Sequence, residues 1–170
     1  ASMERRQLAK TGMLRSAHML GNEEEIIFTA TDLLADTKLA PELSNEAHYY
    51  RAKAYLDAGK TDGAMEDLKI LAKDTRNVYG AEAKYKVAQI YFDGGQTDKA
   101  EQEVLNYIEV STPHTYWLAR SFVLLADVYM KSGRNLDAKQ YLLSLKQNYQ
   151  ADDDIAGMIE SRLEKLKTEN

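Results

Sequence analysis

Cysteine is absent from the 170 residues, and its absence excludes disulfide bonds, thiolate nucleophiles and zinc–thiolate sites. No apolar stretch approaches the ~18 residues that a membrane-spanning helix needs, so direct insertion into a membrane is not expected. The formal net charge is −5, and acidic and basic residues are mixed along the chain. Because no basic stripe is available to neutralise phosphates, nucleic acid is not an expected partner.

Proline and strand signals are scarce as well. The two prolines, Pro41 and Pro113, both fall between candidate helices, and no run of residues alternates at period two. Apolar residues instead recur three and four positions apart, as in Leu118, Phe122 and Leu125, which is the spacing of an amphipathic helix. The pattern predicts an all-α chain of antiparallel helix pairs followed by one further helix. The expected pairs are 4–20 with 23–37, 44–58 with 61–76, 79–93 with 97–110, and 115–132 with 135–149, and the last helix is 153–167.

One short pattern recurs three times. Residues 52–64, 88–100 and 126–138 each contain an alanine, a tyrosine three positions later, a glycine four after that and an alanine five after the glycine. The steps between copies are 36 and 38 residues, a period that indicates stacked helical repeats. One helix pair buries too little apolar surface to offset ordering its residues at ~1–2 kcal/mol each. Stability is therefore expected to come mainly from the interfaces between neighbouring pairs.

The recurring residues have structural explanations. A glycine after the first helix of each pair can take the left-handed conformation that closes a helix; these are Gly21, Gly59, Gly95 and Gly133. The side-chain oxygen two residues later is expected to cap the second helix, at Thr61, Thr97 and Asn135. The repeated alanines let the two helices approach closely. The tyrosines are expected to fill space toward the next repeat, at Tyr55, Tyr91 and Tyr129.

This order of alanine, tyrosine, glycine and alanine resembles the tetratricopeptide repeat. Three copies align at 46–77, 82–113 and 120–151, and a degenerate fourth aligns at 8–41 with Leu14, Ala17, Gly21 and Ile26 in its key positions. The resemblance implies a right-handed α-solenoid of about four antiparallel helix pairs plus a C-terminal capping helix. It also implies a single domain over residues 4–170, with repeats at about 4–41, 44–77, 79–113 and 115–151.

Two departures from the family pattern are visible. The steps exceed the usual ~34 residues, and the aromatic residue near the start of the first helix is replaced by His48 or Lys84. Longer repeats, and the stretch 116–122, resemble tetratricopeptide proteins of the bacterial cell envelope, which favours periplasm or envelope over cytoplasm. Trp117, the only tryptophan, lies in that stretch and is expected to be buried against the preceding repeat.

The two ends of the chain differ. The last expected helix is apolar on one face only, as a terminal cap requires; that face holds Ile155, Met158, Ile159, Leu163 and Leu166. The first expected helix lacks a polar back, because Met13, Leu14, Ala17, Met19 and Leu20 spread around it. We therefore expect further repeats upstream in the native protein.

Residues with chemical potential are few. His18, His48 and His114 lie too far apart or in a loop, and Asp152–Asp154 lack the glycine and glutamate of a calcium-binding EF-hand loop. The carboxylates of Asp152–Asp154 and of Glu23–Glu25 stand at helix starts, where they favour the helix dipole. No nucleophile, base and acid come together in sequence, and no glycine-rich phosphate loop is present. We expect no catalytic site, no metal site and no cofactor.

A groove is the remaining candidate site. In tetratricopeptide arrays the first helices line a concave face that binds peptides, and the resemblance places ten residues there: Tyr49, Lys53, Leu56, Tyr85, Gln89, Phe92, Arg120, Val123, Asp127 and Met130, with Glu82 at the edge. The expected function is a non-enzymatic scaffold that binds a protein or peptide partner. The alternative is a structural assembly module, a C-terminal piece of a longer array that packs on upstream repeats or self-associates through its N-terminal helices.

Overall fold

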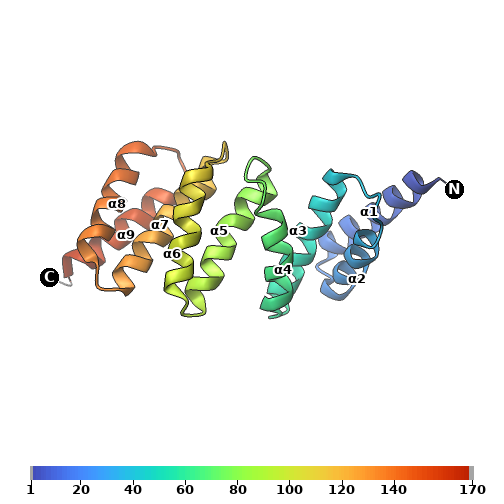
Figure 1. The fold of residues 1–170 in the computed structure, drawn as a ribbon, viewed down its shortest axis with the longest axis horizontal. Coiled ribbons are helices and arrows are strands. Elements are labelled where there is room, and N and C mark those ends of the chain that lie inside the picture. Colours follow the sequence, from blue (N-terminus) through green and yellow to red (C-terminus); the bar gives the residue numbers. More distant parts are fainter. Residues whose placement is uncertain (1, 169–170) are drawn as a thin grey trace. The chain divides into compact units, whose positions relative to one another are not determined.

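The computed structural model describes residues 2–168, and within them every regular element is an α-helix (Figure 1). The bounds of the nine helices in this range are α1 Met3–Leu20, α2 Glu23–Leu34, α3 Pro41–Asp57, α4 Thr61–Leu71, α5 Val78–Asp93, α6 Thr97–Val110, α7 Thr115–Lys131, α8 Asn135–Asn148 and α9 Ile155–Thr168. The prediction of an all-α repeat chain with paired helices is confirmed. None of the described helices is both long and apolar enough to cross a membrane.

The described residues group into two compact units, one ending at Ala83 and the other beginning at Lys84, so the division falls inside α5. The core of the first unit is built from α1, α2 and α3; its buried members include Leu14, Ile26, Ala30, Leu33 and Ala47. The core of the second unit is richer in aromatic residues, with Tyr85, Tyr107 and Tyr129 beside Leu125 and Leu142. Each unit has its own continuous apolar interior.

The predicted turns explain the pairing. All four predicted glycines have positive φ, from 68° at Gly21 to 79° at Gly95, and non-glycine residues avoid this region. The amide of Lys60 reaches back to the carbonyl of Tyr55 at 2.7 Å across Gly59, which closes α3 with the hydrogen bond of a Schellman motif. Two or three residues between helices suffice to reverse the chain, so the helices of a pair lie antiparallel (Figure 1).

The predicted capping residues are wrong by one position. Helices α4, α6 and α8 begin at Thr61, Thr97 and Asn135 themselves, so these residues already have helical backbone. The capping position belongs to Lys60, Gln96 and Arg134, which make no side-chain capping bond. A cap must accept from an amide two or three residues ahead, and these three side chains do not. Of the described second helices, α2 is capped in this way, because Asn22 accepts from the amide of Glu25 at 3.2 Å.

The repeated alanines are fully buried between paired helices. Ala52, Ala64, Ala88, Ala100, Ala126 and Ala138 are each exposed by 1% or less, in agreement with their predicted role in close helix approach. The repeated tyrosines contact the second helix of their own pair: a Cβ on Gly63 would lie 3.1 Å from the Tyr55 ring, and Tyr129 lies 5.5 Å from Tyr141 between ring centroids. Tyr55 and Tyr129 therefore pack within their own helix pair, which differs from the predicted packing toward the next repeat.

Candidate functional site

The expected site residues of the first unit come from α3 and are half-buried. The hydroxyl of Tyr49 donates to Glu82 at 3.1 Å and accepts from the Lys53 amine at 3.0 Å. The Tyr49 ring also stacks on Tyr79 with centroids 4.3 Å apart, and burial raises the pKa of Tyr49. Leu56 is half-buried two turns beyond Tyr49 on α3. Tyr49 thus links α3 to the start of α5, and Lys53 is the charged residue among the expected site residues of α3.

The second unit holds an arginine set among aromatic rings. One terminal nitrogen of Arg120 donates to the Tyr116 hydroxyl at 3.0 Å and the other to the Tyr85 hydroxyl at 2.9 Å. The guanidinium carbon lies 4.8 Å from the Tyr85 ring centroid, within cation–π range. Burial lowers the pKa of Arg120, but hydrogen bonds to the two phenols raise it more, so the side chain is charged.

The two tyrosine hydroxyls link Arg120 to further polar side chains through hydrogen bonds. The Tyr85 hydroxyl donates to Gln89 at 2.9 Å, and the Gln89 amide donates to Asp93 at 2.8 Å. On the other side the Tyr116 hydroxyl donates to Asp154 at 2.9 Å. Among residues 2–168 no carboxylate forms an ion pair with Arg120 itself. Its charge is therefore held by neutral phenols, with carboxylates only at the ends of the chain of hydrogen bonds.

Trp117 packs against this arrangement. Its ring lies 5.7 Å from Tyr85 and 5.0 Å from Tyr116 between centroids, the second contact being edge-to-face. Because Tyr85 belongs to the preceding helix pair, Trp117 packs against the previous repeat as predicted, but it is only half-buried. The rings hold the side chain of Arg120 in one place.

Three expected groove residues of α5 and α7 are buried or paired within the protein. Tyr85 is 6% exposed and Val123 is 2% exposed, so both belong to the core and offer no surface for a partner. Asp127 is half-buried and accepts two bonds from Arg162 of α9, at 2.7 and 2.9 Å. Asp127 therefore holds the last helix in place. The sequence could not separate the packed members of this helix face from its accessible ones.

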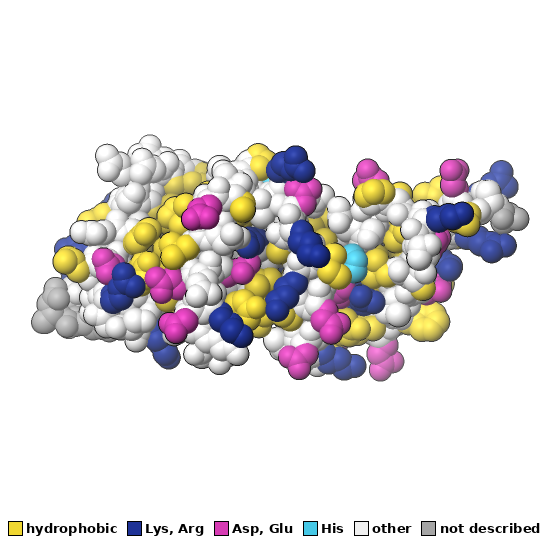
Figure 2. Space-filling model, in the orientation of Figure 1, with side chains coloured by type: hydrophobic (Ala, Val, Ile, Leu, Met, Phe, Trp, Pro, Cys, Tyr) yellow, Lys and Arg dark blue, Asp and Glu magenta, His cyan; other side chains and the backbone are white. Residues whose placement is uncertain are grey.

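The remaining expected residues of the second unit keep some exposure. Gln89, Phe92 and Met130 are half-buried, like Arg120, and Phe92 and Met130 pack on the edge of the core. We call Gln89, Phe92, Arg120 and Met130 the α5–α7 face. On the side of the molecule drawn in Figure 2, basic and acidic side chains are interspersed with apolar ones, and no stripe of one sign is present there.

Two of the three histidines contact neighbouring side chains of the first unit. His18 stacks on Tyr50 with centroids 4.3 Å apart, and Nδ1 of His48 lies 2.7 Å from Asp67. Asp153 accepts from the amide of Ile155 at 2.9 Å, at the start of α9. Between residues 2 and 168 no three histidine, aspartate or glutamate side chains come together as metal ligands.

A buried ion cluster in the first unit was missed by the sequence analysis. Asp67 is fully buried and accepts two bonds from Arg51, at 2.9 and 2.7 Å, besides its contact with His48. Lys84 and Glu103 occupy the positions of His48 and Asp67 one repeat later and pair at 2.7 Å. The signal was available, because His48 and Lys84 replace the family aromatic, and each replacement has an acid at the same distance along the chain.

The comparisons with known proteins agree with this geometry. The tetratricopeptide repeat model matches residues 46–74, which hold most of α3 and all of α4. Residues 46–74 therefore form a tetratricopeptide repeat, and the chain as a whole has a tetratricopeptide-like fold. The model covers one repeat, and the glycine turns and buried alanines carry the same register through the later two. No curated protein matches the sequence.

Two solved structures have a similar fold. The nearly identical TPR-like repeats of a Podosopora anserina protein described as a kinesin light chain match with a TM-score of 0.59 and 16% identity, over 96% of this chain and 94% of that one. A single-residue variant of the same protein matches with a TM-score of 0.62 and 15% identity, over 99% and 96%. At this identity the likeness concerns the fold alone. The resemblance to bacterial envelope proteins stays a prediction.

Proposed function

We propose that this tetratricopeptide-like protein is a non-enzymatic scaffold that binds a peptide segment of a partner protein on the α5–α7 face. Proteins with such repeats generally mediate protein–protein interaction, and the packed aromatic residues make the face rigid. Phe92 and Met130 offer apolar contact area on it, which suits an extended chain. A rigid face loses little conformational entropy when a peptide binds.

Arg120 is the observation that carries the proposal. Its charge is half-buried and is partnered by phenols, with no ion pair to a described carboxylate. A carboxylate of a peptide would form a charge-assisted hydrogen bond there, which is roughly twice as strong as a neutral one. We expect the bound peptide to carry an aspartate, a glutamate or its C-terminal carboxylate at Arg120, with an apolar residue beside Phe92 or Met130.

The test uses an array of short peptides that vary in acidic and apolar content. Wild-type protein should bind acidic members selectively, and Arg120→Gln should weaken that binding at least about tenfold. Arg134→Gln is the matched control, because Arg134 also stacks on a tyrosine, 4.2 Å from the Tyr129 centroid, but lies outside the α5–α7 face. If both variants bind acidic peptides like the wild type, this face is not the binding site.

The alternative assembly function rests on a different observation. Met13, Met19 and Leu20 of α1 are exposed by 53%, 85% and 83%, and a shallow groove lined by Met13 and Leu20 runs between α1 and α2. Exposed apolar patches often mark interaction surfaces. Sedimentation of Met13→Ser/Leu20→Ser distinguishes the two functions: association lost in that variant and kept in Arg120→Gln would favour assembly.

A further inference from the structure

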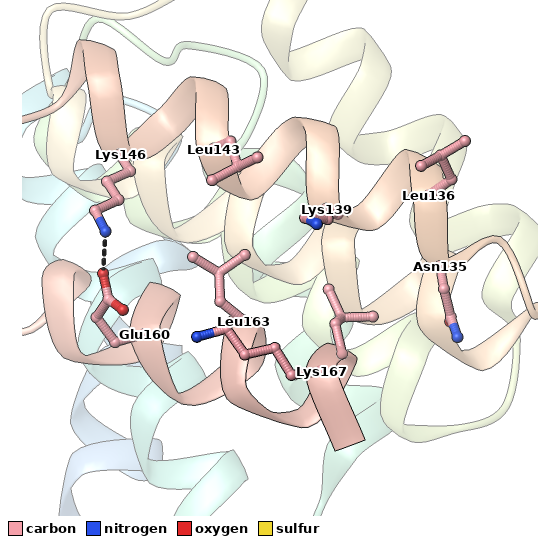
Figure 3. Close-up of a pocket in the computed structure, with 9 residues that line it drawn as sticks. Asn135, Leu136, Lys139, Leu143, Lys146, Glu160, Leu163 and Lys167 are labelled. Atoms are coloured by element: carbon pink, nitrogen blue, oxygen red, sulfur yellow. Dashed lines mark ion pairs between the residues drawn. The ribbon is translucent and has the colours of Figure 1, made fainter. Parts of the chain in front are cut away.

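Two helices of the second unit line a hollow that shares no residue with the α5–α7 face. It lies between α8 and α9 and has a volume of about 390 Å³ (Figure 3). Leu136 and Leu143 of α8 line it and are exposed by 73% and 45%, and Leu163 of α9 lies between the two helices in the figure. Exposed leucines that line a concave surface are typical of a docking groove for a helix.

The charged residues around these leucines are mostly basic. Lys139 and Lys167 line the hollow and form no ion pair with a described residue, whereas Lys146 at one end pairs with Glu160 at 2.6 Å. The formal net charge of the chain is −5, so the two unpaired lysines make this apolar surface locally basic in an acidic chain. Their charge complements an acidic partner.

We infer that the α8–α9 groove binds an amphipathic helix of a partner protein whose apolar stripe is flanked by aspartate or glutamate. Leu136 and Leu143 stand seven residues apart, about 10.5 Å along the helix axis. A partner helix that presents apolar residues at every third or fourth position therefore matches them along its length. The flanking acids meet Lys139 from one helix and Lys167 from the other, which fixes the partner's rotation. This site is independent of the α5–α7 face.

The probe is a stapled helical peptide of about four turns, with leucine at every third or fourth position and glutamate on both sides of the leucine stripe. Two matched peptides replace its glutamates by lysine or its leucines by serine. Titration of the whole chain, followed by fluorescence anisotropy, should give a Kd below about 100 µM for the acidic peptide. Both matched peptides should bind at least about tenfold more weakly.

The variants then assign the site. Lys139→Glu/Lys167→Glu should weaken the acidic peptide at least about tenfold and strengthen the lysine peptide, and Leu143→Ser should weaken both. Lys131→Glu/Lys165→Glu is the control, because it makes the same charge change at exposed lysines that do not line the groove. Circular dichroism should show unchanged helix content in all variants.

Three outcomes overturn the inference. The first is the absence of saturable binding of the acidic peptide up to about 1 mM. The second is an equal loss of binding in the groove variant and in its control, which would mean non-specific charge attraction. The third is a dimer of the chain, seen in sedimentation, that Lys139→Glu/Lys167→Glu dissociates, because a second copy would then be the occupant. Arg120→Gln should leave binding of this peptide unchanged.

Discussion

The buried cluster of His48, Arg51 and Asp67 offers the sharpest test of how the first unit is held together. Asp67→Ala removes a carboxylate that is fully buried in α4 and leaves two partners on α3 without their acceptor. The side chains of Arg51 and His48 are only 18% and 12% exposed, so water cannot readily replace the carboxylate. Arg51 also donates to Thr31 of α2 at 3.1 Å, which extends the cluster to a third helix.

The expected loss is large. Removing one partner of a buried ion pair typically costs about 3–5 kcal/mol, because the remaining charge stays buried without compensation. A domain of this kind is stable by about 5–15 kcal/mol in total. We therefore expect Asp67→Ala to lower the free energy of unfolding by about 3–5 kcal/mol, measured by urea denaturation followed by circular dichroism.

The fourth helix pair supplies the control. Phe122, Leu125 and Tyr141 occupy the repeat positions of His48, Arg51 and Asp67, and the rings of Phe122 and Tyr141 lie 6.1 Å apart between centroids. The triple variant His48→Phe/Arg51→Leu/Asp67→Tyr installs this apolar set in the earlier pair. Since apolar residues often replace a buried ion cluster without loss, it should be more stable than Asp67→Ala. A loss below about 1 kcal/mol in Asp67→Ala, or a triple variant no more stable than Asp67→Ala, would refute the reasoning.

Three further predictions concern stability. Burial raises the pKa of Asp67, but hydrogen bonds from His48 and Arg51 lower it more. The stability that the Asp67 carboxylate contributes is therefore complete above the unfolded pKa of about 3.9 and is lost as the pH falls through the lower folded pKa. In urea titrations below about pH 4, the triple variant should lose less stability than the wild type. Gly80→Ala should lower the melting temperature and reduce the free energy of unfolding by at least about 2 kcal/mol, because the alanine Cβ would lie 1.9 Å from the carbonyl oxygen of Asp74. An unchanged melting temperature would contradict this close approach. Lys60→Asn should raise the free energy of unfolding by about 0.5–1 kcal/mol. Lys60 makes no capping bond, whereas Asn22 caps α2 from a similar backbone conformation. No gain in urea denaturation would count against the capping argument.

The helices could be predicted well because their signals are local. Periodic apolar residues and the four left-handed glycines gave the bounds of most helices within one or two residues, as in α7, expected at 115–132 and found at Thr115–Lys131. The capping residues were predicted one position too late along the chain. Whether Thr61 precedes α4 or begins it depends on the backbone angles of Lys60, at φ −93° and ψ 69°, and residue types alone do not specify those angles.

The candidate site was predicted less completely. The binding face carried over from the family pattern stays a prediction, although Arg120 and Gln89 are joined through the Tyr85 hydroxyl across α5 and α7. The family pattern did not foresee that Val123 is buried or that Asp127 pairs with Arg162, 35 residues later. The outcome depends on how far neighbouring helices are rotated about their axes, which a periodic pattern leaves undetermined.

The sequence by itself determined the repeat: the helix pairs, the glycine turns that reverse the chain and the buried alanines that let paired helices approach. These features follow from backbone conformation and from periodicity within one or two turns of helix. Only the tertiary structure decided which side chains are partnered across helices. The Asp67 cluster, the phenols around Arg120 and the lysine-rimmed hollow between α8 and α9 each join segments about 16 to 38 residues apart. Contacts of that range require the offset and rotation of packed helices, which are properties of the folded chain.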